Sequence, residues 1–373
     1  MSKLCSDEAE LAQGRIAKSE AEFAFDLARG PLVRFTLLAR SVRRHVLLVS
    51  MHHVISDGWS VRLMLRELAH FYGCAVRGEP HGLPPLPIHY ADYASWQTRR
   101  VEGARMMAEE HFWLSQLDGA PLTLECPTAS GTRQRSFRAA CEVSRLRLDE
   151  VDALRRSASK SLPTPSTVTR FTALLSAFLV VLHRMTGALD IVVGTAVAGR
   201  VRPELEALIG FFVNVLPLRV SLRQNPSFTT IVARTQETVL QALAHQEYPF
   251  DLVVERLRPP RTPDSLPLVN VLFAYHNFGA EHYEVEGLDL ERIRCHYGGA
   301  KYDLALLAVE NEEDAETLSL ELWYDVALFE PQQVRRWLAE FCMLVCCVGR
   351  HLQLRLMALD PLFEPSAASG CIT

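Results

Sequence analysis

The chain has 373 residues, 49% of them hydrophobic, and a formal net charge of −5. This length and apolar content suffice for a large core, and they predict two subdomains. The charge balance argues against a nucleic-acid-binding protein, which normally presents a basic face. No apolar run is long enough to span a membrane, and residues 1–8 lack the apolar segment of a signal peptide. We therefore expect a cytoplasmic protein.

The cysteines indicate reduced thiols and no metal site. There are nine of them, an odd number, and no secretion signal accompanies them. Cys342, Cys346, Cys347 and His351 lie close together in the sequence, but they fall within residues 331–354, which have the pattern of a buried helix. Cysteine often serves there as a small core side chain, and no Cys-x-x-Cys pair supports a zinc site.

The first elements along the chain are predicted to be a helix followed by a hairpin. Residues 7–29 place charged residues and alanines at helical spacing, and Gly30-Pro31 then stops the helix. Residues 32–39 and 45–51 have the pattern of two strands joined by a short polar turn. The continuous apolar run at 46–49 predicts that the second strand is buried on both faces.

The loop after the hairpin carries the candidate reactive residues, which are His52, His53, Asp57 and Gly58. A helix is predicted behind it at 60–72, with Asp57 or Ser60 as its N-cap. A neutral imidazole is the usual side chain for moving a proton near pH 7. Asp57 can pair with a cation or orient the loop, and Gly58 permits a positive φ or a close backbone approach. A lone histidine pair at a strand end is more often structural than catalytic, but the full string from His52 to Gly58 after an apolar strand favours the catalytic interpretation.

Helices and strands alternate in the rest of the chain. A proline-rich loop at 78–89 leads to a helix from Tyr90 to about residue 117, in which Tyr93 and Trp96 are predicted to pack in a core. The loop-like stretch 118–137 is predicted to contain the boundary between two lobes. The elements predicted after it are strands at 138–148, 190–200, 300–304 and 318–324, and helices at 149–161, 171–186 (with Gly187 as C-cap), 228–244 and 331–348.

Three polar residues in this second part are candidates for supporting roles. Arg200, at the end of a strand, is predicted to be the cationic partner of Asp57, although an exposed arginine is an equally good interpretation of the residue alone. Asn214 lies inside an apolar run and a buried amide needs partners, so it either ties backbone segments together or faces the site. His245 is interpreted as structural, because it lies at a helix end before a turn.

The loop also carries a family resemblance. The stretch His52-His53-Val54-Ile55-Ser56-Asp57-Gly58-Trp59-Ser60 resembles the signature of condensation domains of nonribosomal peptide synthetases, and its core recurs in chloramphenicol acetyltransferase. Leu266 and Val269 depart from the last family motif, which weakens an inference about acceptor specificity. The resemblance covers about residues 20–350, and the further stretches that resemble family motifs are 90–96, 190–200, 208–219, 245–251 and, in part, 261–273.

The resemblance implies an α/β fold of the chloramphenicol-acetyltransferase type, with two lobes in a V and the active site at their junction. We expect an N-terminal lobe at 1–128, a C-terminal lobe at 129–359 and a tail at 360–373. Family members carry more chain before the hairpin, including two arginine-bearing motifs that have no match here. We therefore expect an N-terminally truncated domain that is poorly active and prone to associate on its own.

The reaction implied by the resemblance is amide formation between two substrates tethered to carrier proteins as thioesters, as in the biosynthesis of peptide antibiotics. His53 would accept or steer the amine proton, with His52 pointing into the lobe, because consecutive residues at a strand end face opposite sides. Asp57 would pair with Arg200 across the lobe junction, and backbone donors near Gly58 would stabilise the oxyanion. The implied catalytic residues are His53, Asp57 and Gly58, and the supporting ones are His52, Arg200, Asn214 and Trp96.

The resemblance implies no metal or organic cofactor, because the 4′-phosphopantetheine arms arrive on the carrier proteins. The implied partners are donor and acceptor peptidyl carrier proteins and neighbouring domains such as an adenylation domain, with no nucleic acid and no membrane. Three alternatives remain open: an acyltransferase that uses coenzyme A or forms an ester, a non-catalytic module that recruits partners, and an inactive fragment. Trp59-Ser60 after the motif disfavours an epimerisation domain.

Overall fold

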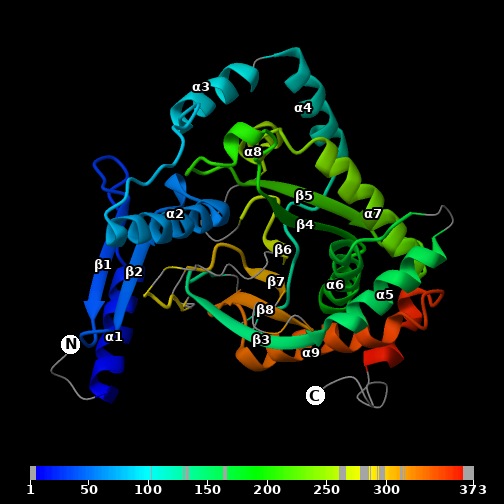
Figure 1. Ribbon diagram of the computed structural model, residues 1–373. Coiled ribbons are helices and arrows are strands. Elements are labelled where there is room, and N and C mark those ends of the chain that lie inside the picture. The colour runs from blue at the N-terminus through cyan, green and yellow to red at the C-terminus, as the bar shows by residue number, and fades with distance from the viewer. Residues whose placement is uncertain are drawn as a thin grey trace. The chain divides into compact units, whose positions relative to one another are not determined.

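The computed structural model describes residues 6–363, without residue 102 and the segments 129–130, 132–133, 163–165, 260–265, 278–284, 286, 292, 294–298, 311–313 and 315 (Figure 1). Arg261 and Ser265 of the partial last motif lie outside the described residues. The chain forms two compact units. Unit 1 comprises Met1–Arg100, Ala198–Val213 and Glu281–Gly299, and unit 2 comprises Val101–Val197, Asn214–Ala280 and Ala300–Thr373. Each unit thus combines segments that are distant in the sequence.

Unit 1 is built on a hairpin and helices. Strands β1 (Val33–Ala39) and β2 (His45–Met51) pair antiparallel, with Val33 opposite Met51. The helices are α1 (Ser6–Ala21), α2 (Gly58–Arg77) and α3 (Tyr90–Val101), and 3-10 turns form at η1 (His53–Ile55) and η2 (Pro203–Leu205). Both strands and α2 confirm the predicted elements, although α2 is longer at both ends. It ends where Gly78 adopts the left-handed conformation at φ 68°.

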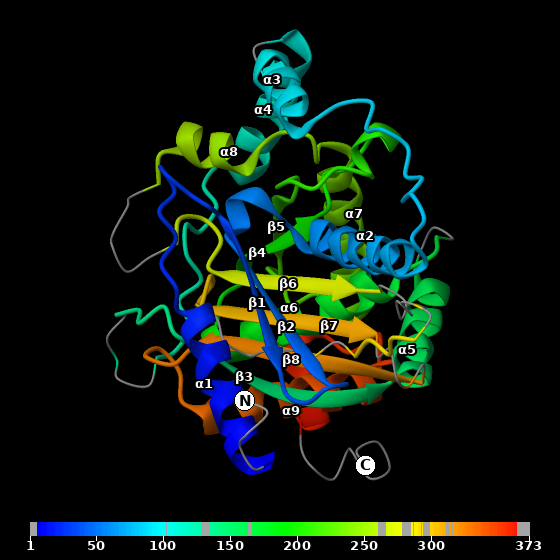
Figure 2. The ribbon, with the colours of Figure 1, turned by 60° about the vertical axis from the view of Figure 1, so that its left-hand side comes forward.

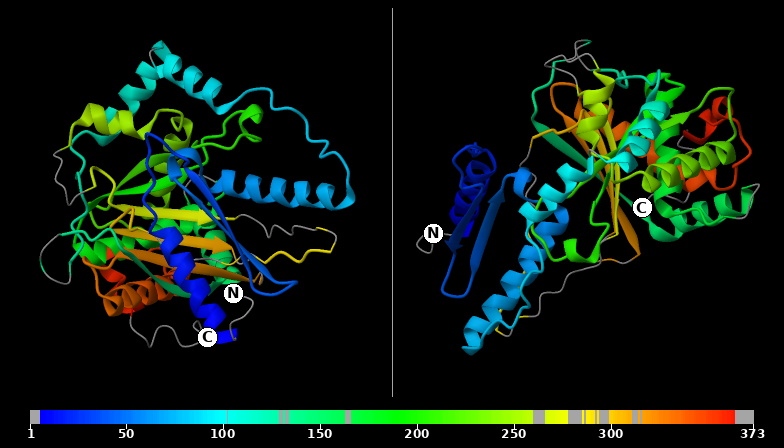
Figure 3. Two further views of the ribbon diagram at one scale, coloured as in Figure 1. Left: turned by 90° about the vertical axis from the view of Figure 1, so that its left-hand side faces the viewer. Right: turned by 90° about the horizontal axis from the view of Figure 1, so that it is seen from above.

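Among the described residues, helix α1 covers one face of the hairpin (Figure 3). Arg34 of β1 donates to Glu20 of α1 at 2.9 Å. On the other face, Phe35 and Leu37 are 57% and 66% exposed. The prediction that β2 is buried on both faces is therefore wrong. The apolar run at 46–49 belongs to a two-stranded sheet. Among the described residues, helix α1 covers the side chains on one face of this sheet, and those on the other face stay largely exposed.

Unit 2 contains a six-stranded mixed sheet, in the order β3-β8-β7-β6-β4-β5 (Figure 2). β7 pairs parallel with β6, and β6 with β4, while the other neighbours are antiparallel. The strand predicted at 318–324 is confirmed as β8, whereas the one predicted at 300–304 is misplaced, because β7 begins only at Leu304. The strands are β3 (Ala139–Arg147), β4 (Asp190–Val197), β5 (Asn214–Ser221), β6 (Val271–His276), β7 (Leu304–Glu310) and β8 (Thr317–Asp325).

Helices α5, α6, α7 and α9 pack together against the sheet of unit 2 (Figures 2 and 3). The central one is α6, whose residues Thr172 to Leu182 are all buried because the other helices and the sheet surround it. It ends at Gly187, with φ 72°, as predicted. The helices of unit 2 are α4 (Ala104–Leu117), α5 (Leu148–Ser161), α6 (Arg170–Thr186), α7 (Phe228–Ala244), α8 (Phe250–Leu257) and α9 (Pro331–Val348).

Several features differ from the expected division of the chain. The single helix predicted from Tyr90 to about residue 117 is broken into α3 and α4, and α4 packs with unit 2 through Trp113, which is 1% exposed. Asp360–Phe363 forms a 3-10 turn with Phe363 buried, so no tail begins at residue 360, and residues 364–373 lie outside the described ones. The expected lobes at 1–128 and 129–359 stay a prediction. In the described part of the chain, no helix has the length and apolar character needed to cross a membrane.

Candidate active site

His52 is a structural cap of the turn that follows β2. Its Nδ1 accepts a hydrogen bond from the backbone N–H of Val54 at 3.1 Å. Its ring also packs edge-on against Phe25, with 6.0 Å between the ring centroids. Because the Nδ1 lone pair is used, the hydrogen-bond network assigns the ring proton to Nε2. His52 therefore holds the loop in shape, and the supporting role predicted for it in the reaction stays a prediction.

His53 differs from its neighbour in exposure and in hydrogen bonding. It is exposed, and its imidazole has no hydrogen-bond partner among the described residues. Its ring stands edge-to-face with Phe211, at 5.3 Å between centroids and 85° between planes. A neutral imidazole with unused ring nitrogens is suited to take up a proton near pH 7. The position of His53 at a tunnel centre stays a prediction.

Asp57 is buried and fully bonded. Its side chain is 0% exposed, and Oδ1 accepts from the backbone N–H of Ser60 at 2.8 Å, which caps α2. Oδ2 accepts from the backbone N–H of Phe212 at 3.0 Å, and Nη2 of Arg200 lies 3.3 Å from Oδ1. The predicted Asp57–Arg200 pair is therefore present. Both residues belong to unit 1, because segment 198–213 groups with the loop that it contacts. The place of the pair at a junction of the expected lobes stays a prediction.

Arg200 is held as firmly as the aspartate. Its side chain is 2% exposed, and it donates to the carbonyl oxygens of Leu205 and Leu208 and to Oγ of Ser60. Burial lowers the pKa of Arg200, and the negative charge of Asp57 opposes that shift. The preceding Gly199 has φ 65°, and a Cβ there would stand 1.9 Å from the carbonyl oxygen of Phe212. Only glycine allows this close approach.

Of the two reasons predicted for a glycine at position 58, a positive φ is not the one that the structure shows. Gly58 is the first residue of α2, its φ is not positive, and an added Cβ would meet no atom within 4 Å. The protein's own packing therefore leaves open space beside it. The backbone N–H groups of Gly58 and Trp59 begin the helix and have no acceptor among the described residues. Such groups are suited to receive a developing negative charge.

The supporting residues fall in different places. Trp96 is half-buried in a small aromatic cluster of unit 1, 5.9 Å from Tyr93 between ring centroids, which agrees with the packing role predicted for both. Asn214 belongs to unit 2, where its Nδ2 donates to the carbonyl oxygens of Gln246 and Tyr248 at 3.0 and 2.7 Å. Its Oδ1 accepts from the backbone N–H of Phe250 at 3.0 Å. Of the two interpretations of Asn214, the tie between backbone segments is therefore the one that its contacts support.

His245 has structural contacts, as interpreted from the sequence. Its Nδ1 lies 2.6 Å from a carboxylate oxygen of Glu109, and its ring stacks on Phe112 at 3.7 Å between centroids. The candidate metal residues also have other partners: Cys346 Sγ donates to Glu150 at 3.3 Å, and Cys342 Sγ lies 3.5 Å from Ser144 Oγ. Across the described residues, no three histidine, cysteine or acidic side chains are arranged to hold a metal ion.

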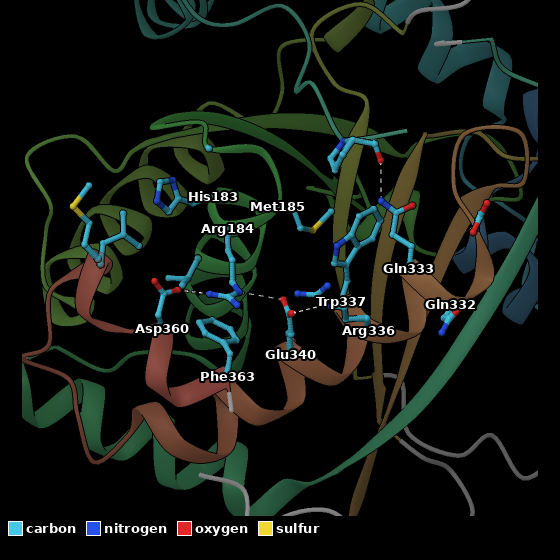
Figure 4. Close-up of a pocket in the computed structure, with 16 residues that line it drawn as sticks. His183, Arg184, Met185, Gln332, Gln333, Arg336, Trp337, Glu340, Asp360 and Phe363 are labelled. Carbon is cyan, nitrogen blue, oxygen red and sulfur yellow. Dashed lines mark hydrogen bonds and ion pairs between the residues drawn. The ribbon is translucent and has the colours of Figure 1, made fainter. Parts of the chain in front are cut away.

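A pocket of unit 2 contains none of these site residues. Figure 4 shows Arg184 at its centre, between Asp360 and Glu340, and Arg336 donating to the same Glu340 at 2.9 Å. These four charged groups are paired with one another, and none of the residues predicted for the site lines this pocket.

Three residues around the loop after β2 make contacts that the sequence does not reveal. Ser60 is a candidate cap by its position in the sequence, yet its buried Oγ bonds both backbone groups of Gly210, 150 residues away. Tyr90 donates through its hydroxyl to the carbonyl oxygen of Phe211 at 2.8 Å. Phe211 carries the ring that contacts His53. No local pattern could have identified these contacts, because each joins segments that are far apart in the chain.

The comparisons with known proteins agree on one family. A family model described as "Condensation domain" matches residues 2–366. Malpibaldin synthetase of Mortierella alpina is 39% identical over 322 residues, which are 86% of this chain and 6% of that protein. Phosphinothricin tripeptide synthetase PhsC of Streptomyces viridochromogenes is 36% identical over 366 residues, which are 95% of this chain and 31% of that protein. The chain thus spans only a small part of these relatives.

Solved structures give the same fold. The X-domain from teicoplanin biosynthesis matches with a TM-score of 0.85 and 27% identity, covering 94% of this chain and 79% of that one. The condensation domain from the monacolin K polyketide synthase MokA matches with a TM-score of 0.77 and the same coverage, and its 21% identity supports the fold alone. The predicted α/β fold of the chloramphenicol-acetyltransferase type is confirmed by these matches together with the mixed sheet.

Proposed function

This chain belongs to the condensation domain family, and from that premise we propose that it joins two acyl or aminoacyl substrates through an amide bond. The substrates would be held as thioesters on carrier proteins, through 4′-phosphopantetheine arms that belong to those carriers. The partners would be a donor carrier protein, an acceptor carrier protein and neighbouring synthetase domains such as an adenylation domain. The synthetases to which the chain is similar support this assignment.

The free amine of the acceptor attacks the carbonyl carbon of the donor thioester. A C–N bond forms, the carbonyl π electrons move to oxygen, and a tetrahedral oxyanion results. When the C=O double bond forms again, the C–S bond breaks and the donor thiolate leaves. The amine proton passes to a ring nitrogen of His53 and from there to the thiolate, so atoms and charges balance.

The observation that carries this proposal is the contrast between His53 and Asp57. The imidazole is exposed and has no hydrogen-bond partner among the described residues, whereas the carboxylate already has three donors. A proton carrier needs a free site, and only the histidine has one. We assign the proton to His53 and a structural role to Asp57.

Positioning of the amine against the thioester contributes to the rate of amide formation as well. An α-amine has a pKa near 8, so part of it is neutral at working pH before any base acts. Holding the amine against the thioester then supplies much of the rate gain. The N–H groups of Gly58 and Trp59 begin α2 and are the donors that we assign to the oxyanion.

The test is amide formation between two carrier-bound substrates, followed by mass spectrometry of the intact acceptor carrier. His53→Ala should lower turnover by about 10²–10⁴-fold, while its melting temperature stays that of the parent. His45→Ala is the matched control, because His45 is also exposed, at the first position of β2. Parallel reactions with acyl-coenzyme A donors or hydroxyl acceptors test the alternative acyltransferases. Normal amide yield from His53→Ala would refute the proton role.

Recruitment of a partner protein is the second candidate function. The X-domain from teicoplanin biosynthesis was solved in complex with OxyB, and it is 25% identical to this chain at a TM-score of 0.84. A recruiting module has no need for an exposed, unbonded histidine, which is why condensation ranks first. In a complete pathway, recruitment predicts that His53→Ala leaves the product yield unchanged, whereas condensation predicts its loss.

A further inference from the structure

We propose that Phe211 positions the imidazole of His53, and that Ser60, Asp57 and Tyr90 hold Phe211 in place for this purpose. The inference rests on the proposed function, since it assigns His53 the proton transfer. It concerns residues of unit 1 only. Phe211 acts on the reaction through His53 and is therefore a positioning residue.

The orientation of His53 needs an explanation. A reactive imidazole is usually oriented by a hydrogen bond to one of its ring nitrogens. His53 has no such bond among the described residues, but its ring meets Phe211 edge-to-face at 5.3 Å and 85°. This arrangement is the one that the charge distribution of aromatic rings favours. An aromatic contact orients the imidazole and leaves both ring nitrogens free to exchange protons.

Phe211 can only orient His53 if its own backbone is fixed. Ser60 Oγ accepts from the N–H of Gly210 at 3.0 Å and donates to the carbonyl oxygen of the same residue at 2.8 Å. Tyr90 Oη donates to the carbonyl oxygen of Phe211 at 2.8 Å. Asp57 Oδ2 accepts from the N–H of Phe212 at 3.0 Å. The side chains of Ser60, Tyr90 and Asp57 thus form hydrogen bonds with the backbone of three consecutive residues, Gly210 to Phe212. We call these three side chains the clasp.

Burial and shape support the same assignment. Ser60 is 0% exposed, so water does not compete for its bonds to Gly210. A Cβ on Gly210 would stand 2.1 Å from the ring of Tyr90, so the glycine is needed for Tyr90 to reach its acceptor. Arg200 also donates to Ser60 Oγ, at 2.9 Å. The Asp57–Arg200 ion pair and the clasp are therefore one connected hydrogen-bond network. This network fixes the backbone of Phe211, whose ring contacts His53.

The chain offers a matched control within the same segment. Phe211 is 39% exposed and Ile209 is 41% exposed, so the two side chains bury similar fractions of their surface. Only Phe211 has a ring against His53. A comparison of Phe211→Leu with Ile209→Ala therefore separates loss of the aromatic contact from general loosening of the segment.

The experiment combines turnover with a direct view of His53. Turnover is measured with carrier-bound substrates, and the protein is labelled with ¹³C-histidine for NMR, with the His53 signal identified by its absence in His53→Ala. Phe211→Leu should reduce kcat by about 10–100-fold through misplacement of the base and should shift the His53 signal. Phe211→Tyr should restore both, and Ile209→Ala should change neither. Tyr90→Phe removes a single bond of the clasp and should give a smaller change in the same direction.

Each possible result either supports or contradicts the role assigned to Phe211. If Phe211→Leu keeps full turnover and an unshifted His53 signal, Phe211 is not a positioning residue. If Ile209→Ala lowers turnover as much as Phe211→Leu does, the effect is general loosening and the inference fails. If Phe211→Leu does not fold, Tyr90→Phe takes its place: an unchanged His53 signal there contradicts the clasp. If the parent protein forms no amide, the proposed function fails, and the His53 signal still tests whether Phe211 orients the ring.

Discussion

The two units of this protein are stabilised in different ways. Unit 2 has one continuous apolar core, in which α6 is buried among α5, α7, α9 and the sheet. The apolar core of unit 1 is a small cluster of Tyr93, Leu205, Leu208 and Phe212, next to the buried polar residues Asp57, Ser60 and Arg200. The site loop is thus fixed by directed hydrogen bonds and an ion pair more than by apolar burial.

Because of this difference, we expect substitutions to lower the stability of the two units in different ways. Loss of apolar contact is graded, because neighbouring side chains relax into the space that is left. Loss of one member of a buried polar network leaves its partner without compensation in a medium of low polarity. The polar network of unit 1 thus fixes the backbone next to His53, where a small displacement affects the reaction. The large apolar core that stabilises the fold lies in unit 2.

The largest effect on stability is expected from Asp57→Ala. It leaves the guanidinium of Arg200 buried without its counter-ion and removes the cap of α2, which should cost about 3–5 kcal/mol. Hydrogen exchange of the α2 amides reports this loss without requiring the units to unfold together. The double variant Asp57→Leu/Arg200→Met removes both charges and should recover part of the loss. If α2 in Asp57→Ala is as protected as in the parent, the ion pair is not what holds the loop.

A substitution in the core of unit 2 should lower the free energy of unfolding slightly less than Asp57→Ala does. Unlike that variant, it should leave turnover per folded molecule unchanged. Leu179→Ala in α6 removes a side chain that is 0% exposed, which should cost about 2–5 kcal/mol in urea unfolding. The matched control is Leu240→Ala, because Leu240 is 60% exposed in α7. We expect turnover per folded molecule to stay at the parental level in both variants. A specific loss of turnover in Leu179→Ala would show that the core of unit 2 also controls the site.

An intermediate, pH-dependent effect is expected at Asp152 of α5. Hydrogen bonds from Arg170 hold the pKa of Asp152 at about 2, with a smaller contribution from Arg155. The lowered pKa means that the carboxylate stabilises the folded state above its unfolded pKa of about 4. Asp152→Asn should therefore cost about 1–2 kcal/mol at pH 7.

The sign of this effect is tested by urea unfolding at several pH values. The difference between the parent and Asp152→Asn should shrink as the pH falls from about 4 to about 2, because the parent carboxylate becomes protonated. Asp149→Asn is the control: its pair with Arg147 is exposed, so we expect no measurable difference at any pH. A difference that grows toward low pH would contradict the assignment.

The smallest effect on stability is expected from Gly58→Ala. The new Cβ meets no protein atom within 4 Å and alanine favours helices, so stability should change by less than about 0.5 kcal/mol. Turnover should nevertheless fall, because the methyl group enters the space that we assign to the substrate. Gly199→Ala is the contrasting variant, since its Cβ would collide with the carbonyl oxygen of Phe212 and destabilise the loop. A fully active Gly58→Ala would show that no substrate approaches this backbone.

The sequence by itself determined the local elements and the family. The apolar spacing predicted β2, α7 and α9 at the bounds that the structure shows, because strand and helix periodicity is a local property. The motif His52 to Gly58 identified the candidate loop and its family. It also predicted different roles for the two histidines, since neighbouring residues at a strand end face different surroundings, and the proton role of His53 stays a prediction.

The tertiary structure decided which groups are used and which stay free. The sequence could not show that β2 has one uncovered face or that Gly58 borders open space, and it could not decide between the two interpretations of Asn214. It gave no sign that Ser60 and Tyr90 fix the backbone beside Phe211. The hydrogen bonds of Asn214, Tyr90 and Ser60 join segments that lie between 32 and 150 residues apart. Local periodicity indicates which face of an element is apolar, but the cover of that face and the partner of each hydrogen bond are set by the distant segment that the fold brings against it.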